Sequence, residues 1–376
     1  MKIVIDARLY GLENTGIGRY TINLISQLQK IDSANEYTVL LRKKYFDQIN
    51  LPNNWKKVLA DYPHYSFSEQ FRLPFLLYSL KPDLVHFLHL NVPILYWQKY
   101  VLTVHDILIS TQTGTDTTTL PFYWYWIKRL VLPAVFINAL KMSQKILVPS
   151  ETVKSEICRI YSIKPSKIVV TYEGVDTKLN TNSKHISTEE KYFLYIGNAY
   201  PHKNLVKAIE ALLILNKTSR VEYKLFIVSA RSVFTERLMN SIKLLGAENI
   251  VEITGYVTDE KLSSLYKNSQ AFLFPSLSEG FGLPGLEALS SGTLLLASEI
   301  PVFREIYSGH AVYFDPRDAS SIKEAMLNSI NMNEKDREEK IKAGQVFSNK
   351  YSWSKTAQET LRVYEEVNEN RGRNYV

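Results

Sequence analysis

Residues 271–288 read AFLFPSLSEGFGLPGLEA, and this segment indicates the fold class more directly than any other. The four apolar residues Ala271–Phe274 predict a buried strand. A loop with two glycines follows, and Pro284 suits the first turn of a helix. A buried strand that leads through a glycine loop into a helix is half of a βαβ unit, which is typical of parallel α/β sheets.

Two glutamates flank this glycine loop. Glu279 lies on the predicted loop and Glu287 on the predicted helix, while Gly280 and Gly282 leave backbone amides open at the helix N-terminus. Such carboxylates can accept hydrogen bonds from sugar hydroxyls on either side of a bound diphosphate, at about 1.5–3 kcal/mol each. The alternative is a helix-capping acid at one position and a surface acid at the other. Capping does not account for the glycines, so the pattern favours a ligand site.

The same alternation of short apolar runs and helical patterns continues on both sides of this segment. In the first half the predicted strands are Lys2–Asp6, Thr38–Leu41, Leu84–Phe87, Val101–Thr103, Lys145–Val148 and Ile168–Val170. The predicted helices there are Arg19–Lys30, Ser66–Leu80 and Glu151–Tyr161. In the second half the further strands are Tyr192–Ile196, Lys224–Val228, Ile250–Ile253 and Leu294–Ala297. The helices there are Leu205–Leu215, Asp259–Lys267 and Pro284–Ser291, with a helical tail from Asp318.

A polar stretch, Asp176–Glu190, separates the two series of elements and predicts a linker. The length of 376 residues suits two domains of ordinary size. We therefore expect two doubly wound α/β domains, residues 1–175 and 176–350, and a last helix at 351–376 that packs back on the first domain. In such sheets ligands bind at the carboxyl ends of the strands.

The composition is that of a packed protein without disulfides, because hydrophobic residues make up 45% of the chain and Cys158 is its one cysteine. The N-terminus has the pattern of a strand and not of a signal peptide. Lys128 and Arg129 interrupt the most apolar stretch, Leu120–Leu140, so it is too polar for a membrane span. We expect a cytoplasmic protein.

The excess of positive charge is confined to the first half of the sequence. Residues 1–175 contain 20 Lys and Arg against 13 Asp and Glu, whereas residues 176–376 contain 25 of each. Such a surface can attract an anionic membrane, nucleic acid or phosphorylated substrates. A basic surface that serves only solubility fits the count equally well.

Glycines also follow the first predicted strand. Gly16 and Gly18 precede a predicted helix, where open backbone amides can bind a phosphate. Thr21 replaces the third glycine of a dinucleotide-binding fingerprint, and the Gly-Lys-Ser/Thr of a Walker A loop is absent. The loop indicates either a phosphate site or a structural turn, and it gives NAD-dependent chemistry no support.

Two more polar groups follow predicted strands. Lys203 lies at a strand-to-helix junction, where its ammonium can lie over a diphosphate. His105 and Asp106 directly follow Val101–Thr103, although a single histidine is otherwise most simply a core or capping residue.

No metal site is expected. His86 and His89 are three apart on a predicted strand, so their side chains should point to opposite faces. No Asp-x-Asp motif occurs in the sequence.

Together these motifs resemble glycosyltransferase family 4, whose members have the GT-B fold of two Rossmann-like domains facing a cleft. Glu279 and Glu287, with seven residues between them, match the E-x7-E motif of that family. The resemblance covers essentially the whole chain. It implies a donor-binding set of Gly16, Gly18, Lys203, Gly280, Phe281, Gly282, Leu283 and Glu287. It implies a catalytic set of His105, Asp106 and Glu279.

The resemblance also implies individual roles. Glu279 would contact the donor sugar and Glu287 the nucleotide ribose, in a nucleotide-sugar domain at 176–350. His105 would stabilise the reacting sugar, in an acceptor-binding domain at 1–175. The family pairs the lysine with a nearby arginine, but Asn198 and the residue before Lys203, a histidine, occupy the usual places. The second cation on the diphosphate is therefore unassigned, with His202 and Arg231 as candidates.

Aromatic residues followed by two cations form a further candidate surface, which consists of Tyr123, Trp124, Trp126, Lys128 and Arg129. Aromatic rings beside Lys and Arg suit the interface of an anionic membrane. An ordinary buried helix with a charged rim is the alternative. Acceptors in the resembling family are often lipid-linked glycans, with which a membrane contact would agree.

The expected reaction is metal-independent transfer of a hexose with retention of configuration, without a cofactor and without nucleic acid as a partner. The opening Ile5–Arg8 and the Gly16–Tyr20 segment most resemble mannosyl- and rhamnosyltransferases of surface polysaccharide assembly, which points to GDP-mannose. The alternatives are an epimerase or phosphorylase-like enzyme of the same fold, and a non-catalytic protein that binds sugar nucleotides or anions.

Overall fold

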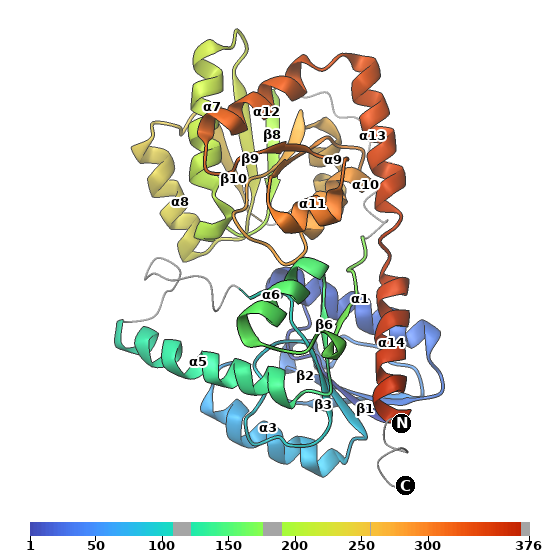
Figure 1. The fold of residues 1–376 in the computed structure, drawn as a ribbon. Helices are drawn as coiled ribbons and strands as arrows, with labels where there is room; N and C mark the ends of the chain where they lie inside the picture. The colour runs from blue at the N-terminus through green and yellow to red at the C-terminus, as the bar shows by residue number, and fades with distance from the viewer. Residues whose placement is uncertain (108–121, 176–189, 256, 370–376) are drawn as a thin grey trace. The chain divides into compact units, whose positions relative to one another are not determined.

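The computed structural model describes residues 1–107, 122–175, 190–255 and 257–369, without the side chains of 122–130 and 259. Two compact units make up the chain (Figure 1). Unit 1 is Met1–Gly174 with Trp353–Val376, and unit 2 is Val175–Ser352. Each unit has its own parallel sheet with helices on both faces. The predicted fold class, two doubly wound α/β domains, is confirmed.

Within the described residues, the sheet of unit 1 has seven parallel strands in the order β3-β2-β1-β4-β5-β6-β7. Their bounds are β1 (Lys2–Asp6), β2 (Glu36–Leu41), β3 (Trp55–Leu59), β4 (Leu84–Phe87), β5 (Tyr100–Thr103), β6 (Lys145–Val148) and β7 (Ile168–Val170). The helices are α1 (Thr15–Ile31), α2 (Lys43–Phe46), α3 (Phe67–Leu80), α5 (Phe122–Met142), α6 (Glu151–Tyr161) and α14 (Trp353–Glu369). The strand order reverses between β1 and β4, and we call this the switch point of unit 1.

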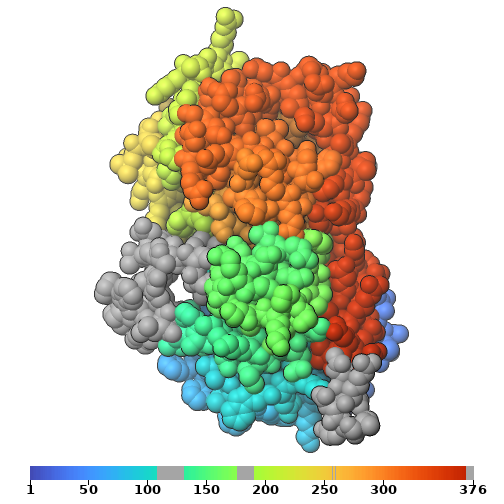
Figure 2. All heavy atoms as spheres, viewed as in Figure 1, coloured from blue at the N-terminus to red at the C-terminus, as the bar shows by residue number. Residues whose placement is uncertain are grey.

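Successive side chains on each strand enter two different packed layers. All four residues of β4 are buried, as expected for a strand covered on both faces. One layer packs α3, α5 and α6 on the sheet, with Leu77, Val85 and Phe87 in its core. α6 buries Val153 and Ile157 beneath it and forms the green surface of unit 1 in Figure 2.

The other face of the sheet is covered by α1 and α14, which pack on each other. α14 is amphipathic, and its buried residues recur every three or four positions. One of them, Tyr364, has its hydroxyl 2.6 Å from Nδ1 of His86 on β4, while Nε2 of the same ring lies 2.8 Å from Oγ1 of Thr103. Burial lowers the pKa of His86 to about 3, so a neutral imidazole links α14 to the sheet.

In the described part of unit 2, six parallel strands have the order β10-β9-β8-β11-β12-β13. Their bounds are β8 (Lys191–Ile196), β9 (Tyr223–Val228), β10 (Val251–Thr254), β11 (Ala271–Phe274), β12 (Leu295–Ser298) and β13 (Val312–Phe314). The helices are α7 (Leu205–Thr218), α8 (Val233–Leu244), α9 (Asp259–Asn268), α10 (Leu283–Ser290), α11 (Pro301–Tyr307), α12 (Ala319–Asn331) and α13 (Glu334–Ser348). The switch point of unit 2 lies between β8 and β11.

Several elements depart from the predictions. The strands Trp55–Leu59 and Val312–Phe314 were missed, the first because it contains two lysines. The helices α2, α8 and α11 were not among the predicted helices either. α1 begins at Thr15, four residues earlier than expected. Gly16 and Gly18 therefore lie in the first turn of α1 and not before it, which corrects their predicted position. None of the helices among the described residues is long and apolar enough to cross a membrane.

Candidate active site

Two of the predicted motifs meet at the switch point of unit 2. β8 and β11 are paired there, and the chain continues outward from them in opposite directions across the sheet. The turn with Lys203 follows β8 and the loop with Glu279 follows β11. Both therefore lie at the carboxyl edge of the sheet, where doubly wound folds bind their ligands.

Hydrogen bonds hold these two loops together. Pro201–Lys203 is a single turn of 3-10 helix, and Asn204 after it has a φ of 59°. The side chain of Asn204 donates to the carbonyl of Pro275 at 3.1 Å. The N–H of Leu277 donates to the carbonyl of His202 at 2.8 Å. Each loop thus positions the other.

An ion pair joins the two loops at their polar side chains. Lys203 Nζ lies 2.6 Å from Oε1 of Glu279, and the hydroxyl of Ser276 donates to the same oxygen at 2.7 Å. The lysine side chain is 14% exposed and that of the glutamate 12%. Both groups are held in place and still accessible, so an anion can compete for the lysine and hydroxyl groups for the carboxylate.

The glycines of the Glu279 loop have a packing role that the sequence did not reveal. Gly282 has a φ of 100°, and a Cβ at Gly282 or Gly285 would collide with the Tyr307 side chain. The hydroxyl of Tyr307 also donates to the carbonyl of Gly282. Phe281 and Leu283 are buried beside it. The loop conformation is therefore fixed by contacts within unit 2 before any ligand binds.

Glu287 lies in the second turn of α10 and is only 2% exposed. The hydroxyl of Tyr266 donates to its Oε2 at 3.4 Å. The alternative of a surface acid at this position is therefore wrong. A buried carboxylate is costly unless polar groups meet it, which makes a purely incidental acid at this position improbable on energetic grounds.

Of the two candidates for the second cation, His202 carries no charge of its own at neutral pH. Burial, with a smaller contribution from the positive charge of Lys203, lowers the pKa of His202 to about 4, so its ring is uncharged at neutral pH. Arg231 is exposed in the segment that follows β9, the neighbour of β8. It thus belongs to the same edge of the sheet as Lys203. No group of three or more potential metal ligands exists among the described residues.

In unit 1, His105 follows β5 and both of its ring nitrogens have protein partners. Nδ1 lies 3.3 Å from Oε1 of Glu173, and Nε2 lies 3.1 Å from the carbonyl oxygen of Leu88. The ring of Tyr20 packs edge-on against it at 4.7 Å. Asp106, next in the chain, is partly buried. The imidazole of His105 is therefore oriented by its own unit, and its side chain keeps 12% exposure.

A buried ion network that the sequence analysis missed occupies the switch point of unit 1. Arg8, just after β1, donates to Asp6 at 2.6 and 2.7 Å and to Oε1 of Glu69 at 2.7 Å. Asn91, after β4, donates to the other oxygen of Glu69. The side chains of Arg8 and Glu69 are fully buried. Two charged residues at the end of the first buried strand and just after it, Asp6 and Arg8, were the signal that could have indicated it.

The glycine segment after β1 is explained by packing in one position only. A Cβ at Gly18 would collide with the carbonyl oxygen of Gly11, whereas a Cβ at Gly16 would enter open space. The structure therefore favours a close helix-to-loop contact at Gly18.

His89 lies beyond the end of β4, so the prediction that it shares a strand with His86 was wrong. Its Nε2 is 3.2 Å from the hydroxyl of Tyr65. The aromatic and basic candidates on α5, Tyr123, Trp124, Trp126, Lys128 and Arg129, have side chains outside the described set.

Comparisons with known proteins agree with this architecture. Residues 176–346 match the model of glycosyl transferases group 1, and residues 14–179 match that of glycosyltransferase family 4. The O-antigen chain mannosyltransferase RfbU of Salmonella typhimurium is 28% identical over 341 residues, which are 87% of this chain and 90% of that protein. The O-antigen chain mannosyltransferase B of Escherichia coli is 26% identical over 388 residues, which are 97% and 99%.

Among solved structures, sucrose-phosphate synthase from Thermosynechococcus elongatus aligns with a TM-score of 0.76 at 16% identity and covers 98% of this chain and 99% of that one. The two family models adjoin each other near the predicted linker and account for both units. This chain therefore belongs to the group 1 glycosyltransferases of family 4 and has their GT-B fold.

Proposed function

We propose that this glycosyltransferase moves mannose from GDP-mannose to a glycan or lipid-linked glycan during surface polysaccharide assembly, with retention of configuration. Two relatives that are aligned over most of the chain are described as O-antigen chain mannosyltransferases, which supports the choice of sugar. The observation that carries the transfer itself is the ion pair between Lys203 and Glu279 at the switch point of unit 2.

In this proposal, donor binding exchanges the partners of that pair. The diphosphate binds the ammonium of Lys203, and hydroxyls of the sugar donate hydrogen bonds to the carboxylate of Glu279. Positive charge fixed beside the leaving diphosphate lowers the barrier because it need not reorganise as negative charge develops. The pair also keeps each group in position.

The remaining donor contacts would come from the loop and helix that follow. Backbone amides of Gly280–Leu283 lie at the N-terminus of α10, which favours negative charge. We assign the ribose to Glu287 and the second charge on the diphosphate to Arg231. Gly16 and Gly18, in the first turn of α1, are assigned to the donor on the family resemblance alone. The same resemblance assigns the transfer step to His105, through its side chain or its backbone, and to Asp106.

The test is transfer of labelled sugar from GDP-mannose, GDP-glucose, UDP-glucose and UDP-N-acetylglucosamine to lipid-linked glycans, with NMR assignment of the anomeric configuration. We expect α-mannosyl product from GDP-mannose, undiminished by EDTA. Glu279→Ala should mainly lower turnover, whereas Glu287→Ala should weaken GDP binding measured by calorimetry. Glu338→Ala on the exposed surface of α13 is the matched control.

Three results would refute parts of this proposal. Transfer from a UDP-sugar alone would remove the assignment of mannose. A loss of activity in EDTA that Mn²⁺ restores would remove metal independence. Equal GDP binding by the wild type and Glu287→Ala would remove the ribose assignment.

A further inference from the structure

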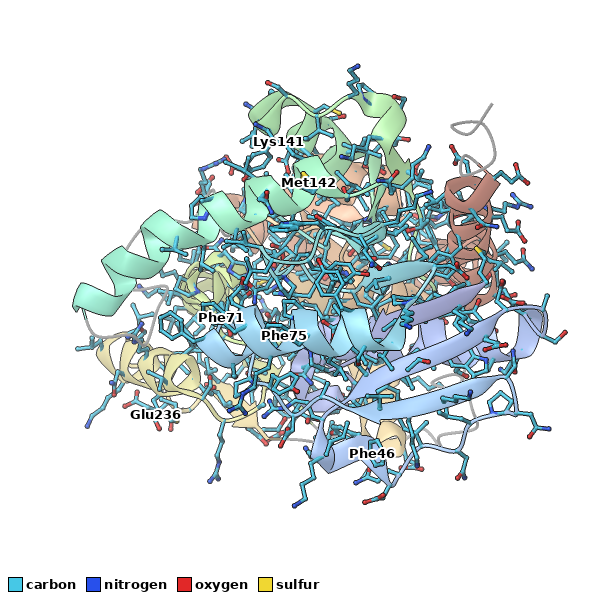
Figure 3. The ribbon with its side chains drawn as sticks, turned by 90° about the horizontal axis from the view of Figure 1, so that it is seen from below. Phe46, Phe71, Phe75, Lys141, Met142 and Glu236 are labelled. Carbon is cyan, nitrogen blue, oxygen red and sulfur yellow. The ribbon has the colours of Figure 1, made fainter. Side chains whose placement is uncertain are left out.

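Three phenylalanines project from α3 into solvent. Phe67, Phe71 and Phe75 recur at intervals of four residues, so they share one face of the helix. They are 78%, 55% and 74% exposed. Figure 3 views unit 1 from the end where α3 lies and labels Phe71 and Phe75 on that helix. Single exposed apolar side chains are common on proteins, but a continuous row on one helix face is not.

A loop next to α3 extends this row. Gln70 accepts a hydrogen bond from the N–H of Ile94 at 3.0 Å. The hydroxyl of Tyr78 donates to the carbonyl of Leu95 and accepts from the N–H of Trp97, each at 3.0 Å. The side chains of Ile94, Leu95 and Trp97 are all exposed, with Trp97 at 72%. We call the set Phe67, Phe71, Phe75, Ile94, Leu95 and Trp97 the α3 apolar face.

The polar groups within the α3 apolar face are already satisfied. Trp97 Nε1 donates to the carbonyl of Ile94 at 3.0 Å, and the hydroxyl of Tyr78 both donates and accepts. Removing water from such a surface breaks few hydrogen bonds, so its burial costs little. Leu73 and Leu77, on the opposite side of α3, are anchored in the core. The face is therefore a rigid surface that gains free energy when it is covered.

The exposed charges of the segment that carries the α3 apolar face are positive. Between Phe67 and Lys99, all of which the structure describes, the carboxylates are Glu69 and Asp83. Glu69 is buried against Arg8, and Asp83 accepts from the backbone N–H of Lys2. Arg72 and Lys81 are exposed on the same segment. Phenyl and indole groups with a cationic rim complement the interface of an anionic bilayer.

We propose that the α3 apolar face docks this enzyme on an anionic lipid bilayer, with Phe71, Phe75 and Trp97 inserted at the level of the headgroups. A second copy of the chain is a poorer occupant, because it would bring a second Arg72 and Lys81 to the contact and no exposed carboxylate of residues 67–99 to pair with them. The inference goes beyond the proposed transfer reaction and does not depend on the donor sugar. It places the surface on α3, independently of the α5 stretch Tyr123–Arg129.

The experiment is co-sedimentation of the full chain with vesicles of phosphatidylcholine that contain 0 to about 40% phosphatidylglycerol, without donor or acceptor. We expect binding to rise with the anionic fraction. Phe71→Ser/Phe75→Ser should reduce the partition coefficient by roughly tenfold or more, because each phenyl ring contributes a kilocalorie or more on leaving water. Arg72→Ser/Lys81→Ser should reduce mainly the salt-dependent part.

The controls separate docking from folding and from other surfaces. Leu244→Ser/Val346→Ser removes two equally exposed apolar side chains from unit 2 and should leave vesicle binding unchanged. Phe71→Trp/Phe75→Trp should restore it, and thermal unfolding and GDP binding should match the wild type throughout. Binding that survives Phe71→Ser/Phe75→Ser, or that is lost only in Lys128→Ser/Arg129→Ser, would overturn the proposal. So would a wild-type dimer in sedimentation equilibrium that the Phe→Ser pair converts to monomer.

Discussion

The two units have the same strand arrangement at their switch points, but the charged residues there differ in exposure. Those of unit 1 are sealed from water, whereas those of unit 2 are partly accessible. In unit 1, Arg8 and Glu69 are fully buried, and Asp6 and Asn91 complete their hydrogen bonds. In unit 2, Lys203 and Glu279 form a single pair that keeps some exposure. A sealed network fixes the loops after β1 and β4, whereas an accessible pair can exchange its partners for those of a ligand. The same strand arrangement therefore carries a buried ion network that stabilises unit 1 and an accessible ion pair that can bind a ligand in unit 2.

Substitution in the buried network of unit 1 should have the largest effect. Arg8→Met would leave Asp6 and Glu69 buried without their cation, which costs about 3–5 kcal/mol in free energy of unfolding. Urea unfolding and calorimetry of the full chain measure this loss. Arg72→Met, on the exposed side of α3, is the control and should stay within about 0.5 kcal/mol of the wild type. If the two variants were equally stable, the buried network of unit 1 would not be a structural feature that distinguishes its switch point from that of unit 2.

The Lys203–Glu279 pair should respond more in activity than in stability. Lys203→Met should lower kcat/KM for transfer by about 10²–10³, the size found when one fixed charge-stabilising donor is lost. Its free energy of unfolding should fall by less than that of Arg8→Met, because Glu279 keeps the hydroxyl of Ser276 as a partner and some contact with water. Lys207→Met, which removes a surface pair with Glu210 on α7, is the matched control. A fall in stability equal to that of Arg8→Met would show that this pair is also structural.

The glycines of α1 give the smallest and most local comparison. Gly18→Ala should cost about 1–3 kcal/mol in free energy of unfolding, because its Cβ meets the backbone of Gly11. Gly16→Ala should be neutral or stabilise by up to about 1 kcal/mol, because alanine is the better helix former. Thermal unfolding of both variants distinguishes them. Equal melting temperatures of the two variants would show that the close contact at Gly18 does not contribute to the stability of the fold.

Much of the fold was predictable because buried parallel strands are short apolar runs with clear boundaries. Ala271–Phe274 and Leu84–Phe87 were located to the residue on that basis. β3 could not be located in this way, since it is an edge strand with two lysines, of which Lys56 is exposed and Lys57 partly buried. The local sequence pattern did not indicate which polar side chains contact each other in the fold. Lys203 and Glu279 are 76 positions apart, and Arg8 and Glu69 are 61 apart, so only the strand order brings them together.

The partner of Glu279 also could not be predicted from the sequence. The E-x7-E spacing indicated a ligand site, but it did not indicate that Glu279 accepts a hydrogen bond from Lys203. The contact of Tyr307 with Gly282, which fixes the loop, likewise joins segments whose proximity depends on how α11 returns to the sheet. Periodicity describes single elements, whereas these contacts depend on the connections between them.

The return of α14 to unit 1 has a consequence for synthesis on the ribosome. Translation proceeds from the N-terminus, and domains commonly fold as they emerge. Tyr364, whose hydroxyl contacts His86 on β4, is nevertheless among the last residues to be made, since it follows all of unit 2 in the chain. Until α14 leaves the exit tunnel, the face of the sheet that it shares with α1 lacks its final helix. Unit 2 can therefore complete its sheet while unit 1 is still unfinished, and early termination before residue 353 would release a chain in which His86 lacks its partner on α14.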